Sequence, residues 1–155
     1  MKKQSNRGAT KISTTTPLEL NLDYGLLTNF KLGEKHNECL AEPFVQSFEY
    51  GYSIGLENFT VSSIMVILRA GYEGFNAFCG PVISNGNSYY FSSSSTVSDL
   101  VDVLGKPFDT WNDGVEKCSM FNLNGICLEA IWHIDSFESL DYLCIEIGDR
   151  GETME

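Results

Sequence analysis

Histidine and cysteine are the side chains of this 155-residue chain best suited to nucleophilic or acid–base chemistry, and the chain has two of the first and five of the second. His36 falls in a predicted helix and His133 in a predicted strand, with no catalytic motif around either. A serine or cysteine nucleophile needs a base within reach, yet there is no G-x-S-x-G elbow and no family-specific cysteine signature. Cys144 and His133 could meet across neighbouring strands, although such strand residues are usually packing residues. We therefore predict that the protein is not an enzyme.

Metal and cofactor sites also have recognisable spacings, and none occurs in this sequence. There is no C-x-x-C pair, no His or Cys at i and i+4, and no D-x-D-x-D-G loop. Residues 112–116 offer oxygen ligands but lack the twelve-residue spacing of a calcium loop. The glycines between Gly71 and Gly86 form neither G-x-G-x-x-G nor a G-K-S/T ending. We predict no metal and no cofactor.

The five cysteines are an odd number at irregular spacing, which argues against a disulfide framework or a zinc knuckle. Cys118, Cys127 and Cys144 lie in apolar strand-like runs, where cysteine behaves as a small hydrophobe. No apolar stretch of the kind found in a secretory signal follows the N-terminal basic residues, and no window approaches the roughly twenty apolar residues of a membrane span. We expect a cytoplasmic protein with no membrane partner.

Charge is distributed unevenly along the chain. Residues 1–17 carry four basic side chains and no acidic one, without hydrophobic periodicity, and are predicted to be a flexible basic tail. Removing these four positive charges from the net charge of −11 leaves −15 on residues 18–155, and residues 99–155 hold thirteen acids and three bases. Such a surface repels nucleic acid. It serves either solubility alone or the binding of a basic partner.

The strongest local pattern lies near the C-terminus. Residues 115–123 and 126–134 are strand-like runs on either side of Asn124-Gly125, a pair suited to the positive φ angles of a type I′ turn. Residues 140–147 alternate apolar and polar side chains, as a half-buried strand does. We predict a three-stranded antiparallel meander.

A predicted helix over 96–105 precedes this meander, with a Ser or Thr cap at its start and Gly105 then Pro107 at its end. Earlier in the chain, apolar residues at helical spacing predict another helix over 32–42. The glycine-rich and aromatic residues 69–93 are predicted to form a short hairpin or ordered loop. Three strand-like pieces follow the first helix, at 45–50, 53–59 and 61–68.

The fold class predicted from these elements is α+β, with one or more antiparallel sheets and short helices packed on one face. Aligning Pro43-Phe44 with Pro107-Phe108 gives an offset of 64 residues and suggests two tandem helix-plus-three-strand units, at 20–68 and 85–147. Two such stretches also arise by chance in an α+β chain, so the duplication stays an open alternative. In either case we predict one compact domain over 18–155.

Strand alternation suggests a binding surface on the C-terminal meander. In residues 126–134, Glu129 and His133 share a face, while Leu128, Ala130 and Trp132 form the apolar face that belongs to the core. Acidic and aromatic residues together are typical of a surface that binds a basic protein. The alternative is an ordinary solvated sheet face. The predicted partner-binding residues are Glu129, His133, Tyr142, Glu146, Asp113 and Glu116.

A helix, a Leu-Gly-x-Pro step and a strand meander, as seen from Asp99 to Pro107 onward, resemble the repeat unit of β-lactamase-inhibitor-like and outer-membrane-assembly-lipoprotein-like domains. Members of the first group are tandem repeats that bind a protein through an aromatic, charged sheet face. The resemblance covers residues 85–147 well and residues 20–68 poorly. The first copy lacks the Gly, and the chain has no lipoprotein lipobox.

A small, acidic chain of this architecture also looks like a bacterial immunity protein of a toxin–immunity pair, such as those of contact-dependent growth inhibition. This resemblance implies an inhibitory protein that binds a cognate toxin, often a basic nuclease, over its active site or an adjoining surface. No binding residue is transferred by alignment. The alternatives are a small enzyme or ligand-binding domain with a pocket between the two units, using His133 and a carboxylate, and a scaffolding subunit. The oligomeric state is not predicted.

Overall fold

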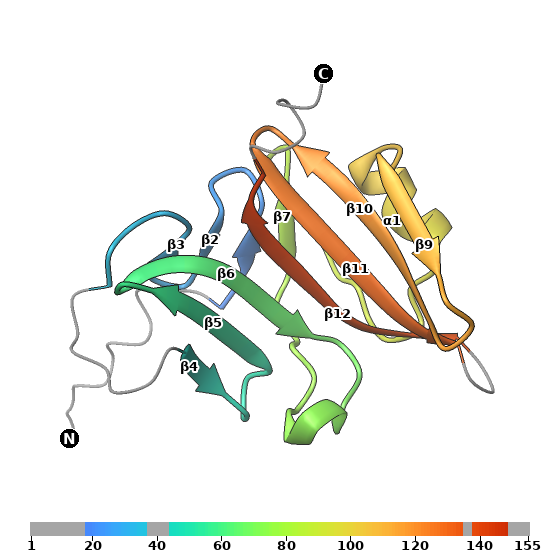
Figure 1. The fold of residues 1–155 in the computed structure, drawn as a ribbon, viewed down its shortest axis with the longest axis horizontal. Coiled ribbons are helices and arrows are strands. Elements are labelled where there is room, and N and C mark those ends of the chain that lie inside the picture. Colours follow the sequence, from blue (N-terminus) through green and yellow to red (C-terminus); the bar gives the residue numbers. More distant parts are fainter. Residues whose placement is uncertain (1–17, 37–43, 135–137, 149–155) are drawn as a thin grey trace, which may run out of the picture.

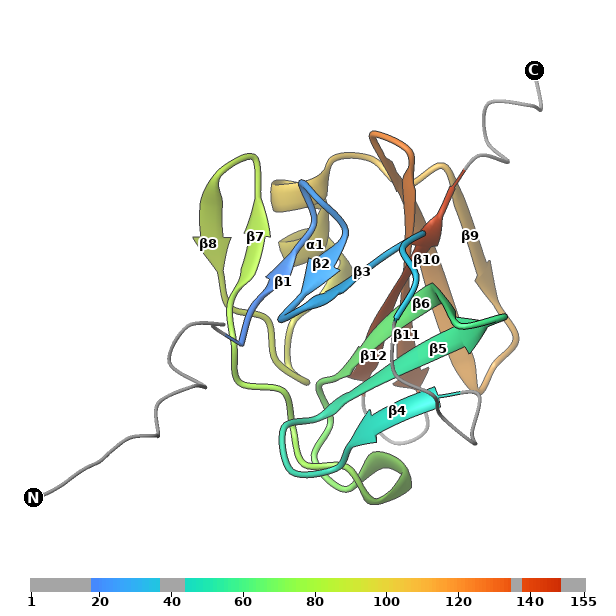
Figure 2. The same ribbon diagram turned by 90° about the vertical axis from the view of Figure 1, so that its left-hand side faces the viewer.

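A computed structural model describes residues 18–36, 44–134 and 138–148 of the chain. These residues form twelve strands, one α-helix and one 3₁₀ turn. The strands belong to two sheets, one of seven strands and one of five. The five-stranded sheet and the helix lie on the same side of the seven-stranded sheet, as two views at right angles show (Figures 1 and 2).

The seven-stranded sheet has the order β4-β5-β6-β12-β11-β10-β9, and every neighbouring pair in it is antiparallel. It consists of two meanders, β4 to β6 and β9 to β12, that meet at β6 and β12 (Figure 1). Its strands are β4 (Phe44–Ser47), β5 (Tyr52–Glu57), β6 (Thr60–Ile67), β9 (Asp109–Asn112), β10 (Glu116–Leu123), β11 (Ile126–Ile134) and β12 (Glu138–Ile147).

The five-stranded sheet has the order β3-β2-β1-β7-β8, with β1 and β7 parallel and its other neighbours antiparallel. The helix α1 (Val97–Leu104) stands beside it, and the 3₁₀ turn η2 (Tyr72–Gly74) lies between β6 and β7 in the chain. The strands of this sheet are β1 (Leu20–Asn21), β2 (Leu26–Leu27), β3 (Phe30–Lys31), β7 (Val82–Ser84) and β8 (Asn87–Tyr89).

The prediction of an α+β fold with short helices packed on a sheet is wrong. The described residues are mostly β-strand and hold a single α-helix. Six strands, β1 to β3 and β7 to β9, were not predicted one by one, and each has only two to four residues. Strands this short show no alternating pattern, so their presence depends on the partners that the tertiary fold supplies.

The helix predicted over 32–42 is wrong in its described part, which ends at His36, and the rest of that range lies outside the described residues. The backbone here bonds to β6 instead of to itself. The Gly33 amide donates to the Val61 carbonyl at 2.9 Å, and the Val61 amide donates to the Glu34 carbonyl at 3.0 Å. Gly33 also has a φ of 85°, which is incompatible with a right-handed helix. Strand pairing has therefore overridden the helical spacing.

The helix predicted over 96–105 is confirmed, with Thr96 as N-cap and Gly105 as C-cap. Thr96 and Asp99 form a capping box: the Thr96 amide donates to Asp99 Oδ2 at 2.8 Å, and the Asp99 amide donates to Thr96 Oγ1 at 3.2 Å. Just before the cap, the Ser95 carbonyl accepts a 2.9 Å hydrogen bond from Trp132 Nε1. The buried indole of β11 thus fixes the start of the helix against the sheet.

The C-terminal meander is confirmed, and β11 matches its predicted bounds. Asn124 and Gly125 have φ angles of 53° and 88°, as a type I′ turn requires. Residues 69–93 contain the β7–β8 hairpin and are ordered, as predicted. An offset of 64 residues places β4, β5 and β6 on β9, β10 and β11 and leaves β12 without a counterpart. The duplication itself stays a prediction.

The ladder between β6 and β12, called the seam below, joins the two meanders. It runs from the pair Tyr142–Ile67 to the pair Glu146–Ser63. Apolar residues from both sides of the seam and from the five-stranded sheet form one hydrophobic cluster between the sheets. The largest fully buried side chains of that cluster include Trp132, Phe121, Leu20, Leu27, Ile54, Ile64, Leu100, Leu128, Leu140, Leu143 and Ile145.

An ion pair between a buried carboxylate and a partly exposed guanidinium lies just beyond one end of the seam. Asp141 has a side chain that is 1% exposed, and its Oδ1 accepts a 2.5 Å bond from Nε of Arg69. The Asp141 carbonyl also accepts the amides of Leu68 at 2.8 Å and Arg69 at 3.3 Å. Oδ2 of Asp141 has no hydrogen-bond partner among the described residues. The guanidinium is therefore the principal group that compensates this buried carboxylate.

No helix in the described ranges has the length and apolar character needed to cross a membrane.

Replacing Arg69 by Met should lower the free energy of unfolding by about 2–3 kcal/mol, because it leaves the Asp141 carboxylate buried without its counter-charge. The double variant Arg69→Met/Asp141→Leu should recover most of that loss, since no charge then remains buried. Urea unfolding of the two variants and the parent protein measures both effects. A single variant as stable as the parent, or a double variant no better than the single one, would contradict the assigned role of the pair.

Candidate functional site

The seven-stranded sheet has one face toward the five-stranded sheet and α1, and a second face, called the open face below, that points away from them (Figures 1 and 2). Directly paired residues of neighbouring strands lie on the same face, so the register assigns its members. They are Gln46, Ser53, Gly55, Glu57, Thr60, Ser63, Met65, Ile67, Asp109, Trp111, Glu116, Cys118, Met120, Asn122, Cys127, Glu129, Ile131, His133, Ser139, Tyr142, Cys144 and Glu146.

Four of the predicted partner-binding residues come together on the open face. Glu129 stands opposite Cys144, and Glu146 stands opposite Cys127 on the neighbouring strand. Tyr142 lies between these pairs and His133, opposite Ile131. Glu146 is exposed, and Glu129, His133 and Tyr142 are half-buried. The prediction that they share one face is confirmed, while their role in binding stays a prediction.

Glu116 and Asp113 have different surroundings. Glu116 is paired with His133 and belongs to the open face. Asp113 lies in the turn between β9 and β10, where its Oδ1 accepts the amides of Glu116 at 2.8 Å and Val115 at 2.9 Å. These backbone hydrogen bonds lower the pKa of the exposed Asp113 carboxyl, because they favour its ionised form. Asp113 therefore has a structural role in the turn.

Negative charge dominates the open face. Of its members, five are carboxylates and none is a lysine or arginine. Alternation within the two C-terminal strands could not predict that Glu57 and Asp109 belong to this face. Their side of the sheet follows only from the pairing of β5 with β6 and of β9 with β10. Trp111 of β9, 41% exposed, was missed for the same reason. The five acids are Glu57, Asp109, Glu116, Glu129 and Glu146.

The surroundings of the Glu129 carboxylate change its pKa. Burial raises its pKa, and the nearby charges of Glu146 and Glu116 raise it further. Cys118 Sγ donates to its Oε2 over 3.8 Å, and this bond acts in the opposite direction. Ionisation of Glu129 is therefore disfavoured in the folded protein.

Two thiols of this face, those of Cys118 and Cys144, are poor nucleophiles. Burial is the main cause that raises the pKa of Cys118 and of Cys144 to about 12, with contributions from Glu129 and, at Cys144, from Glu146. Cys144 also does not meet His133: it is paired with Glu129, four residues away on β11. Four residues of strand are about 13 Å, so the hypothesised Cys–His pair is not formed.

Two tyrosines and an arginine lie together at the end of the open face where Tyr142 is paired with Ile67. The Tyr72 ring of η2 lies 5.8 Å from the Tyr142 ring, centroid to centroid. The Arg69 guanidinium lies 5.3 Å from the centre of the Tyr72 ring while it is bonded to Asp141. Burial raises the pKa of the Tyr142 phenol, so this hydroxyl stays protonated and can donate a hydrogen bond. Tyr142 thus offers a fixed ring with a polar end.

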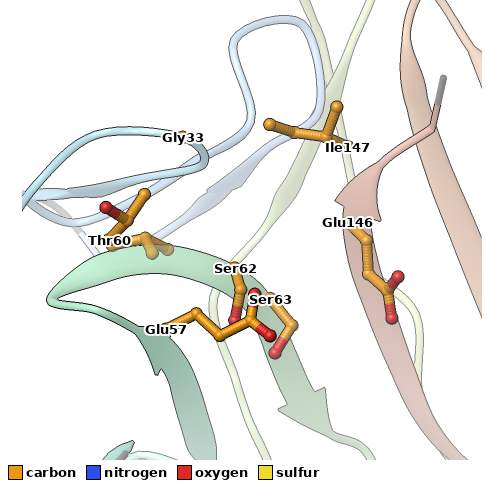
Figure 3. A pocket seen from close by; sticks show the side chains of 8 residues that line it. Gly33, Glu57, Thr60, Ser62, Ser63, Glu146 and Ile147 are labelled. Atoms are coloured by element: carbon orange, nitrogen blue, oxygen red, sulfur yellow. The ribbon is translucent and has the colours of Figure 1, made fainter.

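A pocket of about 440 Å³ opens at the other end of the seam, where the pairing of Glu146 with Ser63 stops. Figure 3 shows the Glu57 carboxylate near the hydroxyls of Ser62 and Ser63, with Glu146 projecting from β12 across from them. The pocket therefore continues the acidic open face. Its lining consists of Gly33, Glu57, Thr60, Val61, Ser62, Ser63, Glu146 and Ile147.

The described ranges contain no group of three or more His, Cys, Asp or Glu side chains placed to hold a metal ion. The arrangement suits non-covalent binding: carboxylates that attract cations, half-buried apolar and aromatic side chains that offer contact area, and protonated groups that donate hydrogen bonds.

Comparison with known proteins adds little to this picture. No protein-family model matches the chain, and no curated protein matches it. Among solved structures, a DUF4309 family protein, YjgB, from Bacillus subtilis is similar with a TM-score of 0.44 and 13% sequence identity, over 74% of this chain and 71% of that one. A likeness at this level supports no conclusion about function.

Glu129→Gln should stabilise the protein at neutral pH by about 0.5–1 kcal/mol, because it removes a half-buried charge that two neighbouring carboxylates repel. The pKa of Glu129 is higher in the folded than in the unfolded chain, so its ionisation costs stability above the folded pKa. Both states bind the proton below about pH 4, and the difference between the two proteins should disappear there.

Thermal or urea unfolding between pH 3 and pH 8 measures this dependence. The matched control is Asp102→Asn, which removes one exposed charge on α1 and should change stability by less than about 0.5 kcal/mol. A Glu129→Gln protein that is less stable than the parent at pH 7 would show that the ionised carboxylate supports the fold.

Proposed function

We propose that the protein is an inhibitory binding protein that neutralises a basic protein toxin by direct contact through the open face. The observation that carries this proposal is the charge of that face: five carboxylates and no lysine or arginine among its described members. A face of one sign, with half-buried side chains between the charges, attracts a partner of opposite sign and speeds its association.

The open face also has the contact groups that a protein interface uses. Tyr142 and Trp111 provide aromatic surface at two places on it. Met120 provides adaptable apolar surface between them, and Met65 provides it on the other side of Tyr142. The half-buried Glu129 fits the same proposal. A charge that costs stability in the free protein becomes favourable when a cationic partner compensates it.

The immunity class supports the choice of partner. The sequence resembles immunity proteins of contact-dependent growth inhibition in its size, its acidity and its lack of a catalytic motif, and such proteins act in the cytoplasm of the cell they protect. A toxin that acts on nucleic acid carries a basic active-site surface, which is the surface that a mostly acidic face complements. In this proposal the protein covers that surface, or one beside it, and does no chemistry.

A second candidate function is supported by the position of the pocket. It lies at the seam, between the two meanders, where the sequence suggested a site for a small ligand. Its lining includes neither His133 nor any other histidine, so the histidine of that earlier hypothesis is not part of it. A ligand-binding domain that uses carboxylates and hydroxyls is the remaining form of this alternative.

The first candidates for the partner are the proteins encoded by the genes next to the gene of this protein. We expect one of them, purified as a basic domain, to form a stoichiometric complex with this protein and to lose its activity in that complex. Calorimetry should show an affinity that falls by about tenfold or more between 50 and 300 mM salt, because ions screen the charges that attract the two proteins.

Variants show whether the open face makes the contact. Asp109→Lys/Glu116→Lys reverses two charges on this face and should weaken the complex by about a hundredfold or more. Glu49→Lys/Asp102→Lys reverses two exposed charges elsewhere and should have at most a small effect. Equal effects of the two double variants, or a complex indifferent to salt, would contradict the proposal.

A further inference from the structure

We propose that the pocket at the end of the seam binds a guanidinium group, the side chain of an arginine that the basic partner inserts beside the open face. This inference rests on the proposed function and adds to it the chemical group that the partner presents and the place where that group binds.

The pocket exists because the backbone opens at this point. β6 is paired with β12 up to Ser63–Glu146. The register between β5 and β6 then shifts, with Gly55 opposite Ser63 but Leu56 opposite Val61, so Ser62 is an extra residue in β6. The bulge turns β6 away from the end of β12, and Figure 3 shows Ser62 and Ser63 of β6 and Glu146 and Ile147 of β12 around the pocket that opens there.

The charges around the pocket favour a cation. Glu57 and Glu146 contribute carboxylates from β5 and β12, and the lining contains no lysine, arginine or histidine. The backbone of Lys35 pairs with that of Thr60, which lines the pocket. The Lys35 side chain does not line the pocket, because its Nζ donates to the Asn58 carbonyl at 3.4 Å. Both carboxylates are exposed, so a ligand can reach them without displacing another side chain.

The number of acceptors favours arginine over lysine. Two carboxylates and the hydroxyls of Thr60, Ser62 and Ser63 surround the pocket and can accept hydrogen bonds from several directions. A guanidinium has five N–H donors in one plane, whereas an ammonium has three donors at one point. A site with acceptors spread over two strands is therefore better satisfied by the wider planar group.

The rest of the lining fits the stem of such a side chain. Ile147, 47% exposed, forms an apolar wall, and Gly33 adds backbone without a side chain, while the Val61 side chain is buried in the core. The methylene groups of an arginine can pack against this wall while its charged end meets the carboxylates. About 440 Å³ is within the range of ligand pockets and is enough for one long side chain with the backbone that carries it.

The site can be tested without the partner. The probes are N-acetyl-arginine methylamide, the lysine derivative, and the citrulline derivative, which has nearly the shape of arginine and no charge. Titrating each into the ¹⁵N-labelled full chain should give saturable amide shifts with the arginine probe at Gly33, Val61, Ser63 and Ile147. The lysine probe should bind about threefold or more weakly, and the citrulline probe about tenfold or more weakly.

Two double variants that remove the same charge complete the test. Glu57→Gln/Glu146→Gln should weaken arginine binding about tenfold or more, while Glu49→Gln/Asp102→Asn, changed at exposed positions outside the pocket, should leave it within about twofold. Thermal unfolding of both variants shows whether the fold is kept.

Equal binding of citrulline and arginine, equal binding of lysine and arginine, or equal effects of the two double variants would each overturn the inference. These outcomes leave the proposed function standing if a basic partner still binds the open face. Arginine binding in the pocket with no protein partner of the open face would instead support the ligand-binding alternative.

Discussion

Five residue pairs between β6 and β12 are the interaction on which the rest of this molecule depends. They join two meanders into one sheet of seven strands, and the five-stranded sheet and α1 together pack against the inner face of that sheet. The ion pair and the pocket of the protein lie at the two ends of this ladder. Arg69 forms an ion pair with the buried Asp141 beyond one end, and the pocket opens at the other. The open face and the pocket both take residues from the two meanders, so neither exists without this ladder.

Sequence patterns predicted the parts of the fold that are local. The Asn124-Gly125 turn and the Thr96 cap are fixed by residues a few positions apart, and both were found where expected. The pairing of β6 with β12 was not predictable, because alternation shows that a strand has two faces but not which distant strand lies beside it. The same limit applies to the site. Alternation within β11 and β12 grouped four residues on one face correctly, whereas the face of Glu57 follows only from the sheet order and the bulge at Ser62.

Energetics and function are connected at the open face. The fold raises the pKa of Glu129 by burial and by the charges of its neighbours, so ionisation of this carboxyl costs stability. Burial raises the pKa of the Cys118 and Cys144 thiols to about 12, and Cys144 lies apart from His133. The negative potential of the open face and its aromatic and apolar contact groups support the proposed recognition of a basic protein surface.

The most direct test of this account is the paramagnetic relaxation of the methionine methyl groups. Met65 and Met120 lie on the open face on opposite sides of β11 and β12, so their methyl signals report the potential at its centre. At low salt, a cationic nitroxide should relax both signals several times faster than an anionic nitroxide of similar size, and added salt should remove the difference. Equal relaxation by the two nitroxides, or protection of both methyls from either one, would contradict an acidic face open to a partner.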